Sequence, residues 1–231
     1  MHDNPRASPR IWQPDWLVLR EMAGALRRVL ADPALRLQGA EVLDFGCGAR
    51  PYESWFAAAG ARYRGADIDG GHEVLIGADG ALGCGDAECD LVASFQVLEH
   101  VWDIAGYLRE ARRVLRADGH LLLSTHGTWL YHPHPTDYRR WTADGLKREI
   151  EERGFRLLRM EPVVGPLAWT TVFRSLGLAH FLKKLPLLGA PLSGASAMLL
   201  NARAWIEDRI TPAEITATNA CTYIGLFRRE A

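Results

Sequence analysis

The stretch EVLDFGCGARPYESWF, residues 41–56, decides the fold. It places a short apolar run that holds Asp44, then two glycines around a cysteine, ahead of an amphipathic segment. This order is typical of the first strand, the glycine-rich turn and the next helix of a nucleotide-binding sheet. The dinucleotide pattern G-x-G-x-x-G is incomplete, because Pro51 stands at the third glycine position. Gly46 and Gly48 would let a ligand lie across the turn without meeting a side chain.

The composition limits the classes of function. The chain has 231 residues, enough for one sizeable core. Its 27 basic and 28 acidic side chains give a net charge of -1, so nucleic acid is not an expected partner. The four cysteines match neither a zinc site nor a disulfide framework, and the polar N-terminus has no apolar signal core. A reducing cytoplasm is the expected compartment.

Strand and helix patterns alternate along the rest of the chain. An N-terminal amphipathic helix is predicted over 12–33. Further helices are predicted over 52–60, 103–119 and 142–155, the last two with Asp103 and Thr142 as caps. Strands are predicted over 40–45, 61–69, 72–79, 89–95, 120–126, 156–164 and 221–230. This alternation predicts an α/β fold with a doubly wound, seven-stranded sheet.

Five stretches together resemble a class I S-adenosylmethionine-dependent methyltransferase. They are VLDFGCGARPY, YRGADID, DLVASFQVLEHV, YLREARRVLRADGHLLLSTH and DYRRWTADGLKREIEERGF, in order within 40–164. The group most similar has a VLEH turn after the fourth strand. The resemblance implies one domain over 1–231 with a Rossmann-like, mostly parallel sheet and an antiparallel last strand. It also implies S-adenosyl-L-methionine as cofactor and methyl transfer to an oxygen or nitrogen of a small molecule.

A set of cofactor-binding residues follows from this resemblance. An acid about 20 residues after the turn is also where doubly wound sheets meet a ribose diol. The implied methionine end comprises Asp44, Gly46, Cys47, Gly48 and Gln96, with Cys47 as a small spacer. The implied nucleoside end comprises Asp67 on the ribose, Ile68 on the adenine face, and Asp79 with Gly80 at the adenine amine. The sequence departs from the family after Asp79, where GALGCGDAEC replaces the usual acidic and aromatic residues.

The catalytic half of the site is predicted from a histidine-rich segment. His126 follows the fifth strand directly and could accept a proton from the attacking atom, and His100 is a second candidate. Glu99 and His100 could instead only position the loop after the fourth strand. His132, Tyr138, Arg139 and Trp141 are predicted to bind the substrate through imidazole, guanidinium and aromatic faces. The alternative for this segment is a helix entry packed by Trp141, with its arginines exposed to solvent. His132, His134 and Asp137 imitate a metal site, but His-x-His beside two prolines is thin support, and no metal is expected.

A helical insertion is predicted over 167–208, before the last strand. Its segment 185–202 has no charged side chain and approaches the length of a membrane span, but prolines and glycines break it. We therefore expect a buried or partner-facing helical hairpin rather than a span. The insertion could be a lid, an acceptor pocket or a homodimer contact, and we favour lid plus pocket. Contact with a membrane surface or a lipid-linked substrate stays open.

Two other functions compete with methyl transfer. A nicotinamide-dependent oxidoreductase would need the full glycine pattern and a second nucleotide-binding half, which the sequence lacks. A non-catalytic module that keeps the cofactor fold could bind partners through the apolar insertion. The set of Asp44, Gly46, Gly48 and Asp67 speaks against that module, because a partner-binding surface does not need these residues. A nucleic-acid substrate is disfavoured by the balanced charge and by SFQVLEH after the fourth strand.

Overall fold

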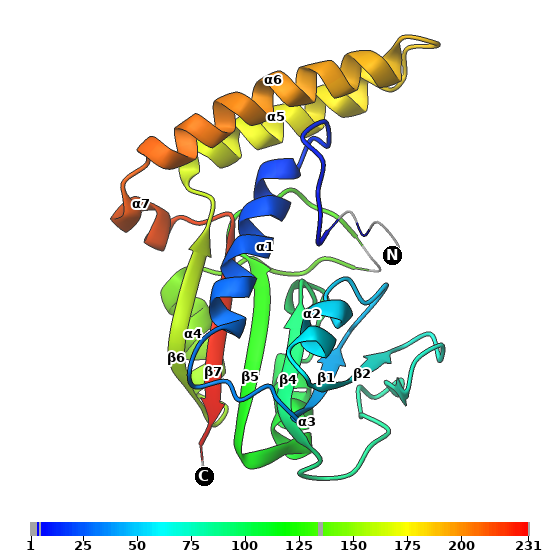
Figure 1. Ribbon diagram of the computed structural model, residues 1–231, viewed down its shortest axis with the longest axis vertical. Coiled ribbons are helices and arrows are strands. Elements are labelled where there is room, and N and C mark those ends of the chain that lie inside the picture. The colour runs from blue at the N-terminus through cyan, green and yellow to red at the C-terminus, as the bar shows by residue number, and fades with distance from the viewer. Residues whose placement is uncertain (1–3, 5, 134–135, 231) are drawn as a thin grey trace.

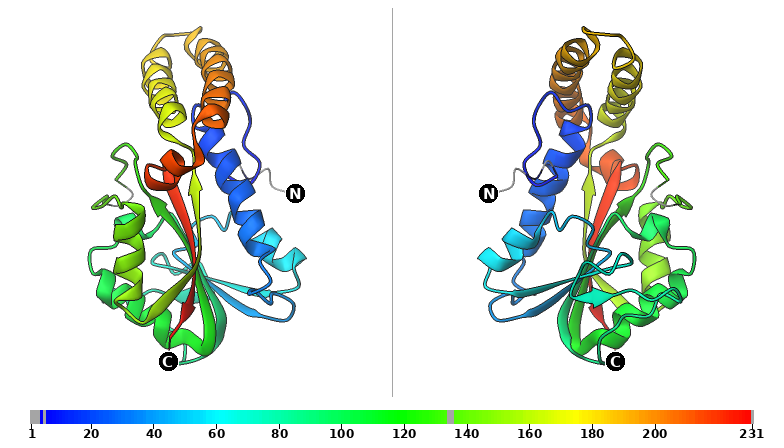
Figure 2. Two further views of the ribbon diagram at one scale, coloured as in Figure 1. Left: turned by 90° about the vertical axis from the view of Figure 1, so that its left-hand side faces the viewer. Right: turned by 90° about the vertical axis from the view of Figure 1, so that its right-hand side faces the viewer.

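The chain folds around a single twisted sheet with helices on both faces (Figures 1 and 2). The computed structural model describes residues 4, 6–133 and 136–230. Seven strands lie in the order β3-β2-β1-β4-β5-β7-β6. They are β1 Glu41–Phe45, β2 Arg62–Asp67, β3 Val74–Leu75, β4 Cys89–Phe95, β5 Leu115–His126, β6 Phe155–Val163 and β7 Thr222–Arg229. The first five strands pair in parallel and β7 runs antiparallel to β5 and β6, which confirms the predicted fold class.

The helices divide the core into two layers, one on each face of the sheet. They are α1 Trp16–Leu30, α2 Glu53–Ala58, α3 Ile104–Val114, α4 Ala143–Glu151, α5 Pro166–Leu182, α6 Gly189–Ile210 and α7 Ala213–Thr218. Helices α1 and α2 cover one face, and α3 and α4 cover the other (Figure 2). Because successive strand residues point to opposite faces, Leu43 packs in the layer of α3 and Val42 in the layer of α1. Central strands buried on both faces explain the continuous apolar runs in the sequence.

The predicted caps hold two of these helices. An oxygen of Asp103 accepts a hydrogen bond from the Gly106 amide at 2.9 Å, at the start of α3. The Thr142 hydroxyl accepts one from the Gly145 amide at 3.0 Å, at the start of α4. Each cap satisfies a backbone donor that the first helical turn leaves without a partner.

Two element boundaries differ from the sequence prediction. The helix predicted over 103–119 ends at Val114, and Leu115 already belongs to β5, paired with Cys89. Burial of the Leu115 side chain and pairing with β4 outweigh the helical pattern of this segment. The strand predicted over 72–79 shortens to two residues, because Gly77 and Gly80 lie in a turn closed by a Gly80–Gly77 backbone hydrogen bond.

The turn after β1 explains both glycines of the opening stretch. Gly46 has φ +85°, and a Cβ built there would lie 2.6 Å from a methyl of Val97. Gly48 also has positive φ, and its Cβ would enter open space. Gln96, after β4, adopts φ 56°, a conformation that is uncommon for non-glycine residues. These turns lie at the carboxyl ends of β1 and β4, where the direction of strand order reverses.

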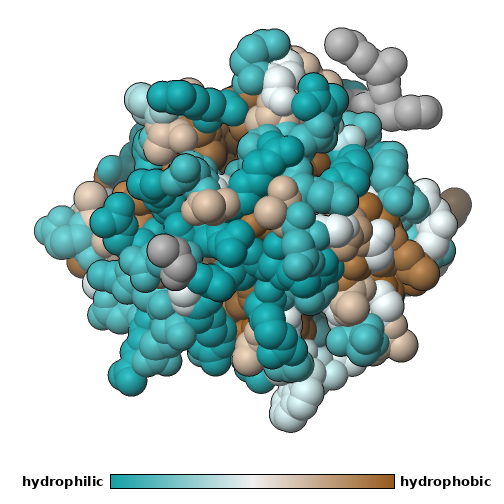
Figure 3. Space-filling view, turned by 90° about the horizontal axis from the view of Figure 1, so that it is seen from below, coloured by the Kyte–Doolittle hydropathy of each residue, from teal (hydrophilic) through white to brown (hydrophobic). Residues whose placement is uncertain are grey.

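The predicted insertion contains a long helical hairpin of α5 and α6, which pack side by side and project beyond the carboxyl end of the sheet (Figure 1). Near the middle of α6, the Asn201 amide donates hydrogen bonds of 2.7 Å to the carbonyls of Ile11 and Gln13. Among the described residues, no helix combines the length and apolar character needed to cross a bilayer. The opposite end of the molecule presents many hydrophilic side chains (Figure 3).

Candidate active site

A cavity of about 1290 Å³ opens at the carboxyl ends of the parallel strands. It is large enough for a nucleoside cofactor and a second small molecule, because drug-sized ligands occupy about 300–1,000 Å³. The structure brings twelve predicted site residues to its wall. They are Asp44, Gly46, Cys47, Gly48, Asp67, Ile68, Asp79, Gly80, Gln96, His100, His126 and His132.

Asp44 is a buried carboxyl group with an unused oxygen. Its Oδ2 accepts a hydrogen bond of 2.6 Å from the Tyr63 hydroxyl, and its Oδ1 has no partner in the described part of the chain. Burial raises the pKa of Asp44 to about 7, against the opposing hydrogen bond from Tyr63. A cationic ligand group beside Oδ1 would stabilise the carboxylate, which fits the ammonium of a bound methionine moiety.

Asp67 at the end of β2 is held in place by backbone amides. Its Oδ2 accepts from Gly48 at 2.7 Å, and its Oδ1 accepts from Ile68 at 2.7 Å. Each carboxylate oxygen keeps a further lone pair, so two hydroxyl groups of a ribose could donate to it. Ile68, 64% exposed, presents an apolar face beside this carboxylate, as an adenine would need.

The remaining cofactor candidates differ in how they could contact a ligand. Gln96 donates to the Ser124 hydroxyl at 3.1 Å, and its buried Oε1 has no partner among the described residues. Asp79 accepts from the Ala81 amide at 3.1 Å and closes its own turn. Burial raises the pKa of the Cys47 thiol to about 12, so this residue is a neutral spacer rather than a nucleophile.

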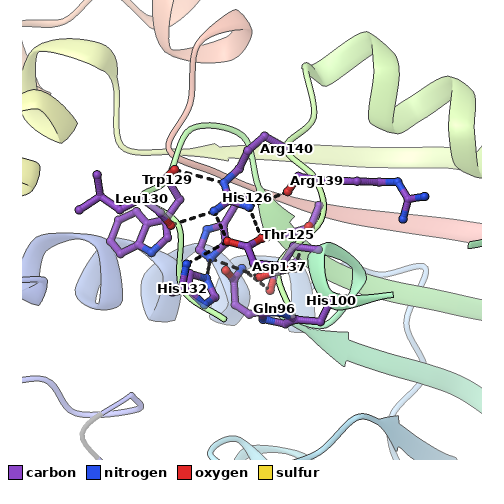
Figure 4. A network of polar contacts seen from close by, with 12 residues as sticks. Gln96, His100, Thr125, His126, Trp129, Leu130, His132, Asp137, Arg139 and Arg140 are labelled. Atoms are coloured by element: carbon purple, nitrogen blue, oxygen red, sulfur yellow. Dashed lines mark hydrogen bonds and ion pairs between the residues drawn. The ribbon is translucent and has the colours of Figure 1, made fainter. Parts of the chain in front are cut away.

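The far side of the cavity carries a cluster of histidines around a buried carboxyl group (Figure 4). Nε2 of His126 lies 2.9 Å from Nε2 of His132 and 3.2 Å from Oε1 of Glu99. Glu99 is fully buried, and its Oε2 accepts a hydrogen bond of 2.9 Å from Thr125. Nδ1 of His100 donates to the carbonyl of Thr136 at 2.7 Å.

Burial shifts the pKa of two members of this cluster, His126 and Glu99. Burial, followed by the nearby His132, lowers the pKa of His126 to about 2, so its imidazole is neutral at physiological pH. Burial raises the pKa of Glu99 to about 7. An imidazole with so low a pKa is a weak proton acceptor, which makes His126 a poor general base in this arrangement. Its general-base role therefore stays a prediction.

Three predicted substrate-binding residues lie away from the cavity wall. The Trp141 indole is buried in the core, 8% exposed, and it is not among the residues that line the cavity, so its contact with a substrate stays a prediction. Arg139 donates to the carbonyls of Val101 and Trp102, and its guanidinium lies over the Trp102 ring. The Tyr138 ring packs against the same indole, with ring centroids 5.2 Å apart. The sequence pattern placed these side chains near the site but could not give their direction.

Of His132, His134 and Asp137, the three residues that imitate a metal site in the sequence, the structure describes His132 and Asp137. Asp137 accepts from the His132 amide at 3.0 Å and binds Arg140 through both oxygens, at 2.5 and 2.6 Å. Its carboxylate is therefore committed to the guanidinium rather than open to a metal ion. His134 lies outside the described residues.

Several residues in or next to the site were not predicted from the sequence. Tyr63 binds Asp44 from β2, and Trp129 stacks on His126 with ring centroids 5.2 Å apart. Arg6 and Gln13, from the polar N-terminal segment, also line the cavity. A signal existed only for Trp129, an aromatic residue three positions after a candidate catalytic histidine. No residue of α5 or α6 is among the described residues that line the cavity, so the lid-plus-pocket role of the hairpin stays a prediction.

Comparisons with known proteins agree with this geometry. A family model described as a methyltransferase domain matches residues 18–159. A probable S-adenosylmethionine-dependent methyltransferase of Mycolicibacterium smegmatis is 31% identical over 164 residues, which are 64% of this chain and 60% of that protein. The match thus spans less than two thirds of that relative's length.

Solved structures show the same fold at low sequence identity. The [4+2]-cyclase SpnF superposes with a TM-score of 0.59 at 19% identity, covering 90% of this chain and 81% of that chain. A putative sarcosine dimethylglycine methyltransferase from Galdieria sulphuraria superposes with a TM-score of 0.58 at 15% identity, covering 100% and 92%. Three observations point to one family: the order of the strands, the acids at the ends of β1 and β2, and the family-model match over 18–159. The chain belongs to the class I S-adenosylmethionine-dependent methyltransferase family.

Proposed function

We propose that this protein transfers the methyl group of S-adenosylmethionine to an oxygen or nitrogen of a small molecule held in the same cavity. One observation carries the proposal. A buried carboxyl group with an unused oxygen, Asp44, and an amide-oriented carboxylate, Asp67, line one half of a cavity whose other half is lined by histidines. The first half suits a cationic nucleoside, and the second suits a polar acceptor.

In this mechanism the protein orients the cofactor and the acceptor and excludes water from the cavity. When bound, S-adenosylmethionine supplies a methyl group that its positive sulfonium has already activated. Asp67 would hold the ribose, and Asp44 with Gln96 would hold the methionine end. The two halves of the cavity would then align an acceptor with the methyl group, and such alignment is worth several kcal/mol in a displacement reaction (about 7–11 kcal/mol in the best intramolecular cases).

Calorimetry separates this proposal from its rivals. The full-length chain should bind S-adenosylmethionine and S-adenosylhomocysteine, and NAD should show no saturable heat. An acceptor screen that measures released S-adenosylhomocysteine should then identify substrates. Binding of NAD alone would support the oxidoreductase. Cofactor binding without turnover on any acceptor would support the non-catalytic module, a relevant outcome because the fold is shared with a protein described as a cyclase.

The exposed tip of the hairpin suggests that the acceptor is reached at a membrane surface. This tip, defined as residues 178–199, exposes apolar side chains: Leu178, Phe181, Leu185, Leu187, Leu188, Leu192, Met198 and Leu199. Leu187 is 98% exposed. The tip also carries Lys183 and Lys184, and no acid occurs in the sequence between Glu161 and Glu207. We propose that the tip contacts an anionic membrane surface, because leucines can enter the headgroup region while lysines meet anionic lipids.

Vesicle sedimentation tests this contact. Wild-type protein should sediment with vesicles that contain anionic phospholipid and much less with neutral vesicles or at high salt. Leu187→Glu with Leu188→Glu should reduce the bound fraction at least about tenfold, since two negative charges replace two exposed leucines that would enter the headgroup region. Ile215→Glu on α7, an exposed apolar residue away from the tip, is the matched control. A wild-type dimer in solution that binds no vesicles would favour the homodimer contact instead.

A further inference from the structure

The strongest unassigned feature is the group of nitrogen and oxygen atoms on the acceptor side of the cavity. Glu99, His100 and His132 each place one ligand-type atom within 4.8 Å of the other two. Nε2 of His126 lies next to two members of this group, at 2.9 Å from Nε2 of His132 and 3.2 Å from Oε1 of Glu99. The three imidazoles line the cavity and the carboxyl group lies buried beneath them. Figure 4 shows the rings of His126 and His132 meeting beside His100.

Hydrogen bonds alone do not satisfy this group. Nε2 of a neutral His126 can carry one proton at most, yet it faces both Oε1 of Glu99 and Nε2 of His132. Oε1 of Glu99 makes no hydrogen bond despite complete burial, and neither does the buried Nδ1 of His126, among the described residues. A buried polar atom without a partner costs about 1–3 kcal/mol. Oε1 of Glu99 is thus a buried acceptor without a hydrogen bond that lies among imidazole nitrogens, an arrangement that fits a bound cation.

The surroundings of the cluster orient its members as the outer shell of a metal site does. The Nδ1 proton of His100 is held by the Thr136 carbonyl, which leaves Nε2 of that ring as an acceptor. The Thr125 hydroxyl holds one oxygen of Glu99, and Asp137 accepts from the backbone amide of His132. The positive charge of Arg140 nearby is matched by its bidentate pair with Asp137. These contacts position the donor atoms before any ion arrives.

We propose that Glu99, His100 and His132 bind a zinc ion, with His126 beside the open coordination position. Three protein ligands of nitrogen and oxygen type with one open position are typical of catalytic zinc sites. The open position faces the cavity, so the inferred ligand is an acceptor with a hydroxyl group. The assignment of a hydroxyl-bearing acceptor to this position rests on the proposed methyl transfer.

The chemistry of such a site selects oxygen as the methylated atom. A hydroxyl bound to zinc loses its proton to solvent water near neutral pH, because the ion lowers the pKa of the coordinated oxygen. The oxygen then forms a bond to the methyl carbon as the carbon–sulfur bond breaks. The electron pair of that bond stays on sulfur, giving a methyl ether and S-adenosylhomocysteine. No strongly basic side chain is required for this step.

A second cluster in the molecule provides the contrast. Cys47, Asp67 and His72 also bring ligand-type atoms within 4.8 Å of one another. Here, however, the guanidinium of Arg50 donates to Nδ1 of His72 at 3.1 Å. A fixed positive charge in contact with the donor atom opposes a cation. His72 is therefore a matched control for the proposed site.

The test titrates metal-free full-length protein with Co²⁺, the spectroscopic substitute for zinc, and with Zn²⁺ by calorimetry. Wild-type protein and His72→Ala should each bind one ion per chain and show visible ligand-field absorption without thiolate-to-metal charge transfer. Glu99→Gln and His132→Asn should weaken binding at least about thirtyfold. Thermal melting confirms that each variant is folded. Calorimetry with S-adenosylmethionine on the same samples should show similar affinity in all four proteins.

Three results would overturn the zinc site. They are no saturable binding to the wild type, equal binding to Glu99→Gln and His132→Asn, or loss of binding in His72→Ala with a thiolate signal in the wild type. None of these results depends on turnover. Failure of S-adenosylmethionine to bind would count against the proposed function and leave the zinc measurement intact.

Discussion

Asp67→Ala should weaken S-adenosylmethionine binding by at least roughly a hundredfold. The carboxylate is oriented by two backbone amides, from Gly48 and Ile68, and each remaining lone pair would accept a ribose hydroxyl. A hydrogen bond to a charged group contributes about 1.5–3 kcal/mol, so the loss of two would amount to about 3–6 kcal/mol. Every 1.4 kcal/mol corresponds to a factor of ten in the dissociation constant. Calorimetry with S-adenosylmethionine measures this change directly.

Asp69→Ala is the matched control for that measurement. Asp69 lies two residues further along the same loop, and its side chain is 69% exposed. Its removal should change the cofactor dissociation constant less than about twofold. Circular dichroism must show that Asp67→Ala keeps the fold, because Gly48 loses a hydrogen-bond acceptor in that variant. An unchanged dissociation constant in a folded Asp67→Ala protein would contradict the whole assignment of the nucleoside half.

Asp44→Asn should raise the stability of the ligand-free protein at high pH while it weakens the binding of S-adenosylmethionine. Burial raises the pKa of Asp44 to about 7 in the folded chain, from an ordinary value of 3.8. Between these two values the folded state holds a proton that the unfolded state has lost, so the unfolding free energy falls as pH rises from about 4 to 7. Without ligand, Asp44→Asn should therefore be more stable than wild type at pH 8, by a few kcal/mol in order of magnitude. At pH 4 the two should match within error.

The binding of S-adenosylmethionine should show the opposite pH dependence. A cationic ligand pairs with the ionised form of Asp44, which is in the minority below pH 7. The dissociation constant of the wild type should fall by up to about tenfold per pH unit between about pH 5 and 7, and then level off. Asp44→Asn should bind more weakly at pH 8 and show a flatter profile. If the profile of the variant matched that of the wild type, Asp44 would not be the titrating group.

Much of the cofactor half was predictable because its pattern is local. Asp44, Gly46 and Gly48 lie within five residues, and a strand followed by a tight turn and a helix allows few arrangements of them. Asp67 follows because adjacent parallel strands bring their carboxyl ends to one edge. The antiparallel last strand came with the family resemblance, and the structure confirms it.

The acceptor half was predictable only in part. His126 lines the cavity as expected, since it ends a strand at that edge. His132, Tyr138, Arg139 and Trp141 lie in one irregular segment, where no periodicity gives the direction of a side chain. Of these four, His132 alone lines the cavity, while Trp141 enters the core.

By itself, the sequence determined the strands and helices, the glycine turn and the two acids at the strand ends, because apolar periodicity and backbone sterics act over a few residues. Only the tertiary structure decided that Tyr63 would hold Asp44, and that Glu99, His100, His126 and His132 would meet. These contacts join residues from separate segments. They depend on where the packed sheet delivers each loop and on which way each buried side chain can point, and no local pattern carries that information.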